Sequence, residues 1–344
     1  MKKLTTLLAA ILFTTGMVFA QNNDADVNQE VDDSEVTIMQ LGSDNKAETD
    51  QIDGNGNMSI NINQSGANND SDILQVKGQW HEAQIDQLGS GNEIDLTQDN
   101  TSTLATINQN GTDNKADVYQ RNYLFSFGTY SSSVGVDQTG DNNQAWVDSD
   151  GFGNNVSITQ GSSGTPSNGQ YANVTQDGSD NESSIEQFGN GGADHTQIQD
   201  GSANNAVAES SWGSSTGLQE QYGSENTSIF KQNGYHNATT IQDGLNNYSW
   251  LRQSAGSSTA MFDQVGDNNQ VNADQRGVGN TMDVDQTGNG NTAGTVGFTN
   301  RGLFQIGDNN MMNVVQNGDM NSAYVNQNGN MNQTTINQSS GSGS

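Results

Sequence analysis

Histidine is the side chain that most often performs acid–base or metal chemistry, and this chain has three: His81, His195 and His236. They are scattered, and two of them fall at expected turn or loop positions. A catalytic or metal site needs convergent groups, and the spacing supplies none. Residues 148–154 (Asp-Ser-Asp-Gly-Phe-Gly-Asn) partly match a calcium loop but lack its closing glutamate. We therefore expect no enzyme, no cofactor and no bound metal.

The composition is that of an acidic, weakly hydrophobic chain without cysteine. Its 344 residues include 40 acidic and 10 basic residues, a formal net charge of −30, and 30% hydrophobic residues. That is too little apolar material for an ordinary globular core. Disulfides are excluded, and nucleic acid is a poor partner because phosphate binding needs clustered lysine and arginine. Two classes remain: a disordered acidic chain, or a repeat architecture that needs little core per residue.

The first twenty residues have the order of a secretory signal peptide. Two lysines precede an apolar run that ends at Phe19, and the small residue Ala20 stands at the expected cleavage position. The run is short for a membrane span, which takes about 20 residues. We predict that residues 1–20 are removed on export and that the mature chain has no membrane span.

The side chains whose chemistry does recur are amides, and their period is eleven residues. An asparagine is followed six residues later by a glutamine, and the next asparagine comes five residues after that. About 28 such units, called arms below, cover residues 21–338, and residues 339–344 are expected to form a flexible tail. The frame positions that we single out are Asn23, Gln29, Ser34, Gln40, Asn45, Gln51, Asn92, Gln98, Asn114, Gln120, Asn269, Gln275, Asn280, Gln286, Asn310, Gln316, Asn321, Gln327, Asn332 and Gln338.

Within each arm, side chains alternate with a period of two. In residues 92–98 the asparagine, isoleucine, leucine and glutamine share one side, while glutamate, aspartate and threonine share the other. Strict alternation over seven residues predicts a half-buried strand. The spacing of three and four that a helix needs is absent. The arms are therefore predicted to be strands.

A glycine usually stands two residues after the glutamine, and we predict that the link is a tight reversal in which glycine supplies backbone conformations closed to other residues. The turn glycines that we single out are Gly42, Gly89, Gly111, Gly140, Gly266, Gly277, Gly288, Gly307, Gly318 and Gly329. Those at 140, 266 and 307 begin Gly-Asp-Asn-Asn turns, which could bind divalent cations weakly, although polar turns commonly have this composition.

Two strands joined by a tight arc make a flat rung of about 22 residues. About 14 rungs stacked at roughly 4.8 Å would pair the backbone amides of neighbouring rungs and give a rod near 65 Å long. An unpaired buried amide side chain costs about 1–3 kcal/mol, but stacked Asn and Gln can donate to the next rung and accept from the previous one. The predicted fold class is therefore all-β: a β-solenoid of strand–turn–strand rungs with an amyloid-like cross-β architecture. Disorder would explain the composition but not the register.

The frame is interrupted at residues 121–131, 161–169 and 291–305. The first two interruptions lie between a glutamine and the next asparagine, where a solenoid tolerates insertions, and the third runs through an arm. The first is rich in aromatic residues and is a candidate binding loop. The four tryptophans share no repeat position and are expected at the surface or on arcs.

The unit Ser/Asn-x5-Gln-x-Gly-x-x-Asn-x5-Gln resembles the curlin repeat of bacterial curli subunits, for example at residues 34–45 and 87–98. The resemblance covers essentially the whole chain after residue 20. It implies a secreted functional-amyloid subunit that polymerises into extracellular fibres of the biofilm matrix, for adhesion and surface colonisation. It also implies three partners: an outer-membrane secretion channel, a periplasmic chaperone and a nucleator subunit. The familiar subunits have about five repeats, and this chain has nearly three times as many.

Both terminal arms, residues 23–29 and 332–338, match the frame, so neither is expected to cap the solenoid. Open edges at both ends predict head-to-tail addition of identical chains into a filament, as a major subunit rather than a nucleator. Recurrent outward aspartates are expected either to slow assembly by mutual repulsion, which salt or acid would relieve, or only to keep the surface soluble. These aspartates are Asp95, Asp117, Asp274, Asp283 and Asp285.

The alternative is a monomeric secreted β-solenoid that binds ice or glycan on a flat face. Such a protein would need a regular outward array of threonine or aromatic residues and capped ends. The outward positions instead hold mostly mixed Asp, Asn, Ser and Thr.

Overall fold

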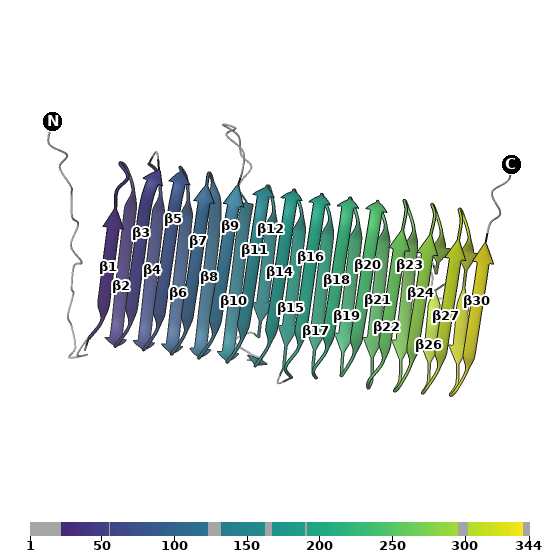
Figure 1. Cartoon of the computed structure of the whole chain (residues 1–344). Helices are drawn as coiled ribbons and strands as arrows, with labels where there is room; N and C mark the ends of the chain where they lie inside the picture. The colour runs from purple at the N-terminus through teal and green to yellow at the C-terminus, as the bar shows by residue number, and fades with distance from the viewer. Residues whose placement is uncertain are drawn as a thin grey trace.

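A computed structural model describes residues 22–54, 56–122, 132–161, 167–189, 191–294 and 302–339. In these segments strands are joined by short arcs, and no helix is long and apolar enough to cross a bilayer. The strands stack into two parallel sheets along a rod, with β1 at one end and β30 at the other (Figure 1). The predicted β-solenoid is confirmed. The signal-peptide prediction, most of the aromatic insertion (123–131) and residues 340–344 of the predicted tail lie outside the described residues.

Successive arms alternate between the two sheets. The 14-stranded sheet contains β1 (Asp24–Gln29), β3 (Lys46–Gly54), β5 (Asp70–Gly78), β7 (Glu93–Asn100), β9 (Lys115–Asn122), β11 (Gln144–Phe152), β14 (Tyr171–Ser179), β16 (Asp194–Ser202), β18 (Thr216–Ser224), β20 (Asn237–Leu245), β22 (Thr259–Val265), β24 (Thr281–Thr287), β27 (Met311–Asn317) and β30 (Gln333–Ser339).

The 16-stranded sheet contains β2 (Glu35–Ser43), β4 (Ser59–Ala67), β6 (Glu82–Ser90), β8 (Thr103–Thr112), β10 (Ser132–Asp141), β12 (Asn155–Gln160), β13 (Ser167–Asn168), β15 (Glu182–Phe188), β17 (Asn205–Ser211), β19 (Thr227–Asn233), β21 (Tyr248–Ser254), β23 (Gln270–Arg276), β25 (Thr292–Ala293), β26 (Leu303–Ile306), β28 (Ser322–Ala323) and β29 (Val325–Asn328). Three of its arms are broken into two strands: β12 with β13, β25 with β26, and β28 with β29. The described residues therefore form fourteen levels in one sheet and thirteen in the other.

Every pairing is parallel, and most partners are about one rung apart in sequence. β1 pairs with β3 so that Asp24 lies opposite Lys46 and Gln29 opposite Gln51. In β7 the side chains of Ile94 and Leu96 are buried, while that of Asp95 is exposed. The period-two alternation is thus confirmed.

The apolar interior is divided into two clusters. One extends from Ala47 to Ala208 and the other from Phe230 to Ala323. Between them the inward positions are polar: His195, Gln197 and Gln219 are all buried. Neither ring nitrogen of His195 has a hydrogen-bond partner among the described residues, and burial lowers its pKa to about 4.

The histidine fits because its neighbours along the column are small. His195 lies opposite Ala172 on one side and Gly217 on the other. A Cβ added to Gly217 would lie only 2.2 Å from Nδ1 of His195. The rung around His195 is therefore packed, but its imidazole gains no hydrogen bond in exchange for losing water.

All ten predicted turn glycines have positive φ, between 98° and 141°. At Gly111 an added Cβ would lie 1.9 Å from the carbonyl oxygen of Gly140, so close stacking requires glycine as well. The predicted tight reversal at the glycine needs one correction. Strand pairing continues through it in several arms, with Gly89 opposite Gly111, so the chain turns after the glycine.

The turn has a second left-handed position that the sequence analysis missed. It immediately precedes the asparagine, as at Asp44 and Asp113, with φ of 56° and 55°. This position is mostly filled by Asp, Asn or Gly, which tolerate that conformation best. The frequent occurrence of Asp, Asn and Gly at this position is the sequence feature that could have predicted it.

Candidate functional site

The singled-out Asn, Ser and Gln positions all face inward and form four columns, one at the start and one at the end of the arms in each sheet. The 14-stranded sheet brings together Asn23, Asn45, Asn92, Asn114, Asn280, Asn310 and Asn332 at the arm starts, and Gln29, Gln51, Gln98, Gln120, Gln286, Gln316 and Gln338 at the arm ends. The 16-stranded sheet brings together Ser34, Asn269 and Asn321, and Gln40, Gln275 and Gln327.

The glutamine columns are hydrogen-bond ladders with a fixed direction, each interrupted at one rung. Nε2 of Gln51 donates to Oε1 of Gln75 at 2.9 Å, and Nε2 of Gln75 donates to Oε1 of Gln98 at 2.8 Å. The same amide nitrogens also reach backbone carbonyls of the opposite sheet, as from Gln75 to Ser59 at 3.0 Å. Each glutamine therefore joins successive rungs and also ties the two sheets together.

The asparagine columns run in the opposite sense. Nδ2 of Asn92 donates to Oδ1 of Asn69 on the preceding rung at 3.0 Å, and also to the carbonyl oxygen of Gly111 on the following rung at 3.1 Å. Asn114 repeats both contacts, to Asn92 at 3.1 Å and to Gly140 at 2.7 Å. The regular spacing of glycine and asparagine along this chain therefore has a physical cause: each asparagine hydrogen-bonds the glycine carbonyl in the arc of the following rung.

Each glutamine ladder is broken by a serine. Ser149 takes the glutamine position between Gln120 and Gln176, and Ser210 does so between Gln187 and Gln232. The Oγ atoms of both serines lack a partner among the described residues. A hydroxyl is too short to continue the ladder, so we regard these two rungs as its weakest points.

The three histidines occupy interior columns and do not converge. His81 and His236 take asparagine positions, where ring nitrogens lie 2.8 Å from Thr103 Oγ1 and 3.0 Å from the Asn233 carbonyl respectively. Burial is the main cause that lowers the pKa of each. Within the described segments no group of three or more His, Asp or Glu could hold a metal ion.

The Gly-Asp-Asn-Asn turns have a structural use. Oδ1 of Asp267 accepts a hydrogen bond from the backbone N–H of Leu245 on the preceding rung at 3.0 Å. Asp308 does the same for Val278 at 2.9 Å. Aspartate and asparagine side chains at this turn position therefore link successive arcs, as Asn289 accepts in turn from the N–H of Asp267.

On the outer faces, each of the seven basic residues in the described segments lies against an acidic residue, usually on an adjacent rung. Lys115 contacts Glu93 at 2.6 Å, and Lys231 contacts Glu209 at 2.6 Å. The predicted outward aspartate Asp274 needs correction: it is only 4% exposed, because Arg252 and Arg276 cover it. It is held in an ion-pair cluster and is not an exposed repelling charge.

Two other outward aspartates, Asp95 and Asp117, stack on one another, and Asp285 stacks on Asp263, whereas Asp283 lies opposite Met261 and Asn313. Asp95 lies between Asp72 and Asp117 on adjacent rungs. Partial burial raises the pKa of Asp117, and the charge of Asp95 adds to the effect. Asp283 is affected in the same way, by burial and then by Asp285. Burial, and to a smaller extent neighbouring carboxylates, therefore disfavours ionisation of Asp117 and Asp283.

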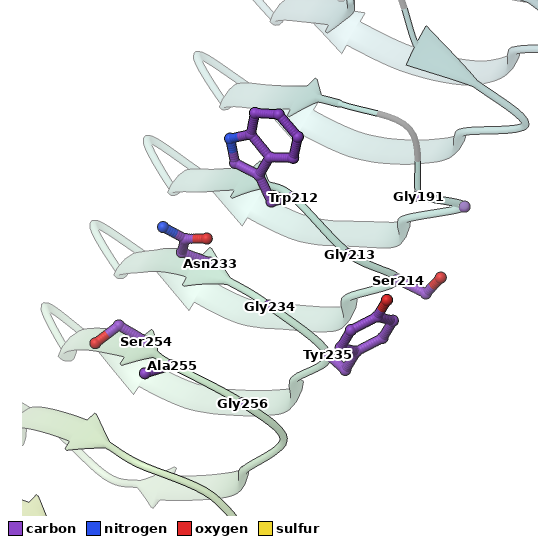
Figure 2. A pocket seen from close by; sticks show the side chains of 11 residues that line it. Gly191, Trp212, Gly213, Ser214, Asn233, Gly234, Tyr235, Ser254, Ala255 and Gly256 are labelled. Atoms are coloured by element: carbon purple, nitrogen blue, oxygen red, sulfur yellow. The ribbon is translucent and has the colours of Figure 1, made fainter.

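A surface groove of about 710 Å³ runs over four successive arcs between β15 and β22 (Figure 2). Its floor is glycine backbone, including Gly213 and Gly234, and Trp212 and Tyr235 lie beside it. Both aromatic side chains are more than 60% exposed. No acid, base or metal ligand lines the groove, so it offers a contact surface rather than catalytic chemistry.

Among the described residues, the two ends of the rod are open edges with complementary amides. At the N-terminal end, Gln29 and Gln40 donate forward and no preceding glutamine donates to their Oε1 atoms, while Nδ2 of Asn23 has no partner in the described segments. At the C-terminal end, Gln338 and Gln327 have no following glutamine to accept from Nε2. The N-terminal end therefore lacks glutamine donors from a preceding rung, and the last glutamines of the C-terminal end lack acceptors on a following rung.

These features define a class: a parallel β-solenoid whose interior is held by amide ladders. Residues 307–339 match the family model described as the curlin associated repeat, and they comprise β27 to β30. No curated protein sequence matches the chain. The matched unit recurs in the same frame through most of the other described rungs, so the match and the fold together support membership of the curlin-repeat family.

Proposed function

We propose that this chain is a secreted structural subunit that adds head to tail to copies of itself, forming curli-like extracellular fibres of the biofilm matrix. The proposal includes adhesion and surface colonisation as the role of the fibres, with an export channel, a chaperone and a nucleator as partners implied by the family. No enzymatic activity is part of it. The observation that carries it is the pair of unpaired, complementary edges.

The edges favour addition for three physical reasons. β1 and β2 at one end, and β30 with β28 and β29 at the other, have a neighbouring strand on one side only. Unpaired backbone groups at a sheet edge recruit another strand. Val27, Val36 and Ile336 are inward-facing but only partly covered, so docking would also bury apolar surface.

A second candidate function is favoured by one observation, the groove beside Trp212 and Tyr235. Exposed aromatic rings over a polar floor can stack on sugars. A glycan-binding monomer would need closed ends, however, and both described ends are open. Glycan binding is therefore the weaker candidate.

The test is to block one edge without touching the interior. Met311 N–H donates to the Asn332 carbonyl, and Met311 lies opposite Gln333. Alternate residues of a parallel strand direct their N–H groups to the same side, so Thr335 N–H points to the empty edge. Thr335→Pro removes that donor and places a ring where the next strand would pair.

The expected result is that Thr335→Pro stays folded by circular dichroism but elongates fibre seeds at least tenfold more slowly than the matched control Thr335→Ala. The control keeps the N–H group and changes the same outward side chain. Equal elongation by the two variants would contradict edge addition. A wild-type chain that remains monomeric while the folded monomer binds soluble glycans would favour the second candidate.

A further inference from the structure

The number of arms determines how two copies of this chain fit together, given the proposed head-to-tail assembly on which this inference rests. The described residues form twenty-seven arms, fourteen in one sheet and thirteen in the other. The first arm, β1, and the last arm, β30, therefore lie in the same sheet. The top levels at the C-terminal end are β30 in the 14-stranded sheet and the broken arm of β28 and β29 in the 16-stranded sheet.

Consecutive arms of the solenoid are related by a half-turn about the rod axis and a rise of half a rung. This follows because each arm repeats the same inward pattern and successive arms alternate between the sheets. The arm that would follow β30 belongs on the sheet of β28 and β29. An incoming copy begins with β1, so it continues the stack only if it is rotated by a half-turn.

Without that rotation, β1 of the second copy would pair with β30, and β2 would face β28 and β29 across an empty level. The gap would be one strand wide, about 4.8 Å, and would leave the edge amides of two strands without partners. With the rotation, β1 pairs with β28 and β29, and β2 pairs with β30. Both sheets then continue at their normal spacing.

The rotated arrangement also matches side chains column by column. Asn23 and Gln29 of β1 come over Asn321 and Gln327, which continues both ladders. Ala25 and Val27 come over the inward residues Ala323 and Val325. Like residues thus stack on like residues in this sheet.

The contact that β2 makes with β30 also stacks chemically similar residues on one another. Ser34 and Gln40 come over Asn332 and Gln338, and Ile38 comes over Ile336. In the unrotated arrangement Ile38 would face the 16-stranded sheet across the gap and would have no such partner.

Charge supports the N-to-C sense of this contact. β28, β29 and β30 contain no acidic residue, whereas β1 carries Asp24 and Asp26, and β2 begins with Glu35. The three carboxylates would come over Ser322, Tyr324 and Gln333, all uncharged. Two N-terminal ends brought together would instead oppose acidic strands.

We propose that successive subunits of the fibre are related by a half-turn about its axis, because the open edge formed by β28, β29 and β30 fits β1 and β2 of a second copy only in that orientation. The fibre then repeats every two subunits, at about 130 Å, since each subunit contributes about 65 Å of stacked strands.

A single surface label tests this arrangement in the intact chain. The chain has no cysteine, and Ser157 is exposed near the middle of the 16-stranded sheet, so Ser157→Cys supplies one attachment point for nanogold. In cryo-electron micrographs of labelled fibres, successive particles are expected about 65 Å apart along the axis and alternately on opposite faces. Particles all on one face would overturn the half-turn while leaving fibre assembly intact.

The matched control changes only the parity of the arms. A chain with a second copy of residues 328–338 inserted after Gln338 has one more arm, and repeat arrays tolerate added units. In that variant the label is expected on a single face. Alternation that persists in both chains, or a lack of alternation in both, would overturn the inference. Failure of the wild-type chain to form fibres would overturn the proposed function together with this inference.

Discussion

A buried amide that must donate cannot be replaced by a carboxylate, and Gln98→Glu tests this directly. Gln98 is fully buried and accepts a hydrogen bond from Gln75 at 2.8 Å. Its Nε2 faces three acceptors: the carbonyls of Glu82 at 3.1 Å and Thr103 at 3.2 Å, and Oε1 of Gln120 at 3.2 Å. A glutamate of the same shape would keep the acceptor and lose both donor hydrogens.

The magnitude follows from burial and from those three acceptors. A carboxylate desolvated beside acceptors has its pKa raised by about 3 units above its usual value near 4.3, which corresponds to about 4 kcal/mol. Because the folded-state pKa is raised, the penalty is absent below about pH 4.3 and grows as pH rises towards about 7. At acid pH the neutral carboxyl still donates one hydrogen bond, so the remaining cost is about 1 kcal/mol.

The assay is amide hydrogen exchange of a peptide covering β7, in the Thr335→Pro background so that the chain stays monomeric during the measurement, since its fibres are expected to elongate slowly. At pH 7.5 protection is expected to fall by roughly five-thousandfold, the equivalent of about 5 kcal/mol, and at pH 4.3 by about tenfold or less. The matched control is Gln84→Glu, which makes the same change at an exposed outward position of β6 and is expected to stay within about 0.5 kcal/mol. Equal protection of the two variants at pH 7.5 would refute the ladder as a source of stability.

Three further predictions follow from other positions. Burial lowers the pKa of His195 from its usual 6.5 to about 4, so β16 should lose up to about 3 kcal/mol of stability as pH falls from about 6.5 to 4. Amide hydrogen exchange of β16 should show this loss. The His195→Gln variant should show no such pH dependence. Gly111→Ala should destabilise its rung by at least about 2 kcal/mol, because Gly111 has a φ of 141° and an added Cβ would lie 1.9 Å from a carbonyl oxygen. The matched control is Gly135→Ala, which should be neutral or slightly stabilising because no atom lies within 3.9 Å of the added Cβ. Urea unfolding in the Thr335→Pro background measures both. Burial and nearby carboxylates raise the pKa of Asp117 and Asp283, so protonation favours the folded, stacked state. Assembly half-times should therefore shorten as pH falls towards 4.5 or as salt rises. Half-times independent of both would leave only the solubility role.

The eleven-residue frame predicted the strands, the sheets and the inward columns because each rung repeats the same chemistry at the same place. The expectation that both amides donate to the next rung is right for glutamine and wrong for asparagine, which donates to the preceding rung, because an amide can present either atom to its neighbour. The bond from Asn92 to the Gly111 carbonyl was also missed, because it depends on how far the glycine arc protrudes. Only the stacked geometry reveals that distance.

Two other misses have identifiable causes. His81 was read as a turn or loop residue because the frame slips beside it, and His236 because Asn237 was taken as the frame asparagine. Both histidines fill asparagine positions. Asp274 was read as exposed because only its own arm was considered. Comparison with residues 22 positions away would have found Arg252, which lies opposite it on the next rung.

The central claim is that folded chains stack end to end into a fibre with the strands perpendicular to its axis. The most direct measurement is X-ray diffraction from aligned fibres of the mature protein, residues 21–344, grown at neutral pH in moderate salt. A meridional reflection near 4.7 Å with an equatorial reflection near 10 Å is the predicted result. A soluble monomer that is rich in β-structure and forms no fibres under these conditions would contradict the account.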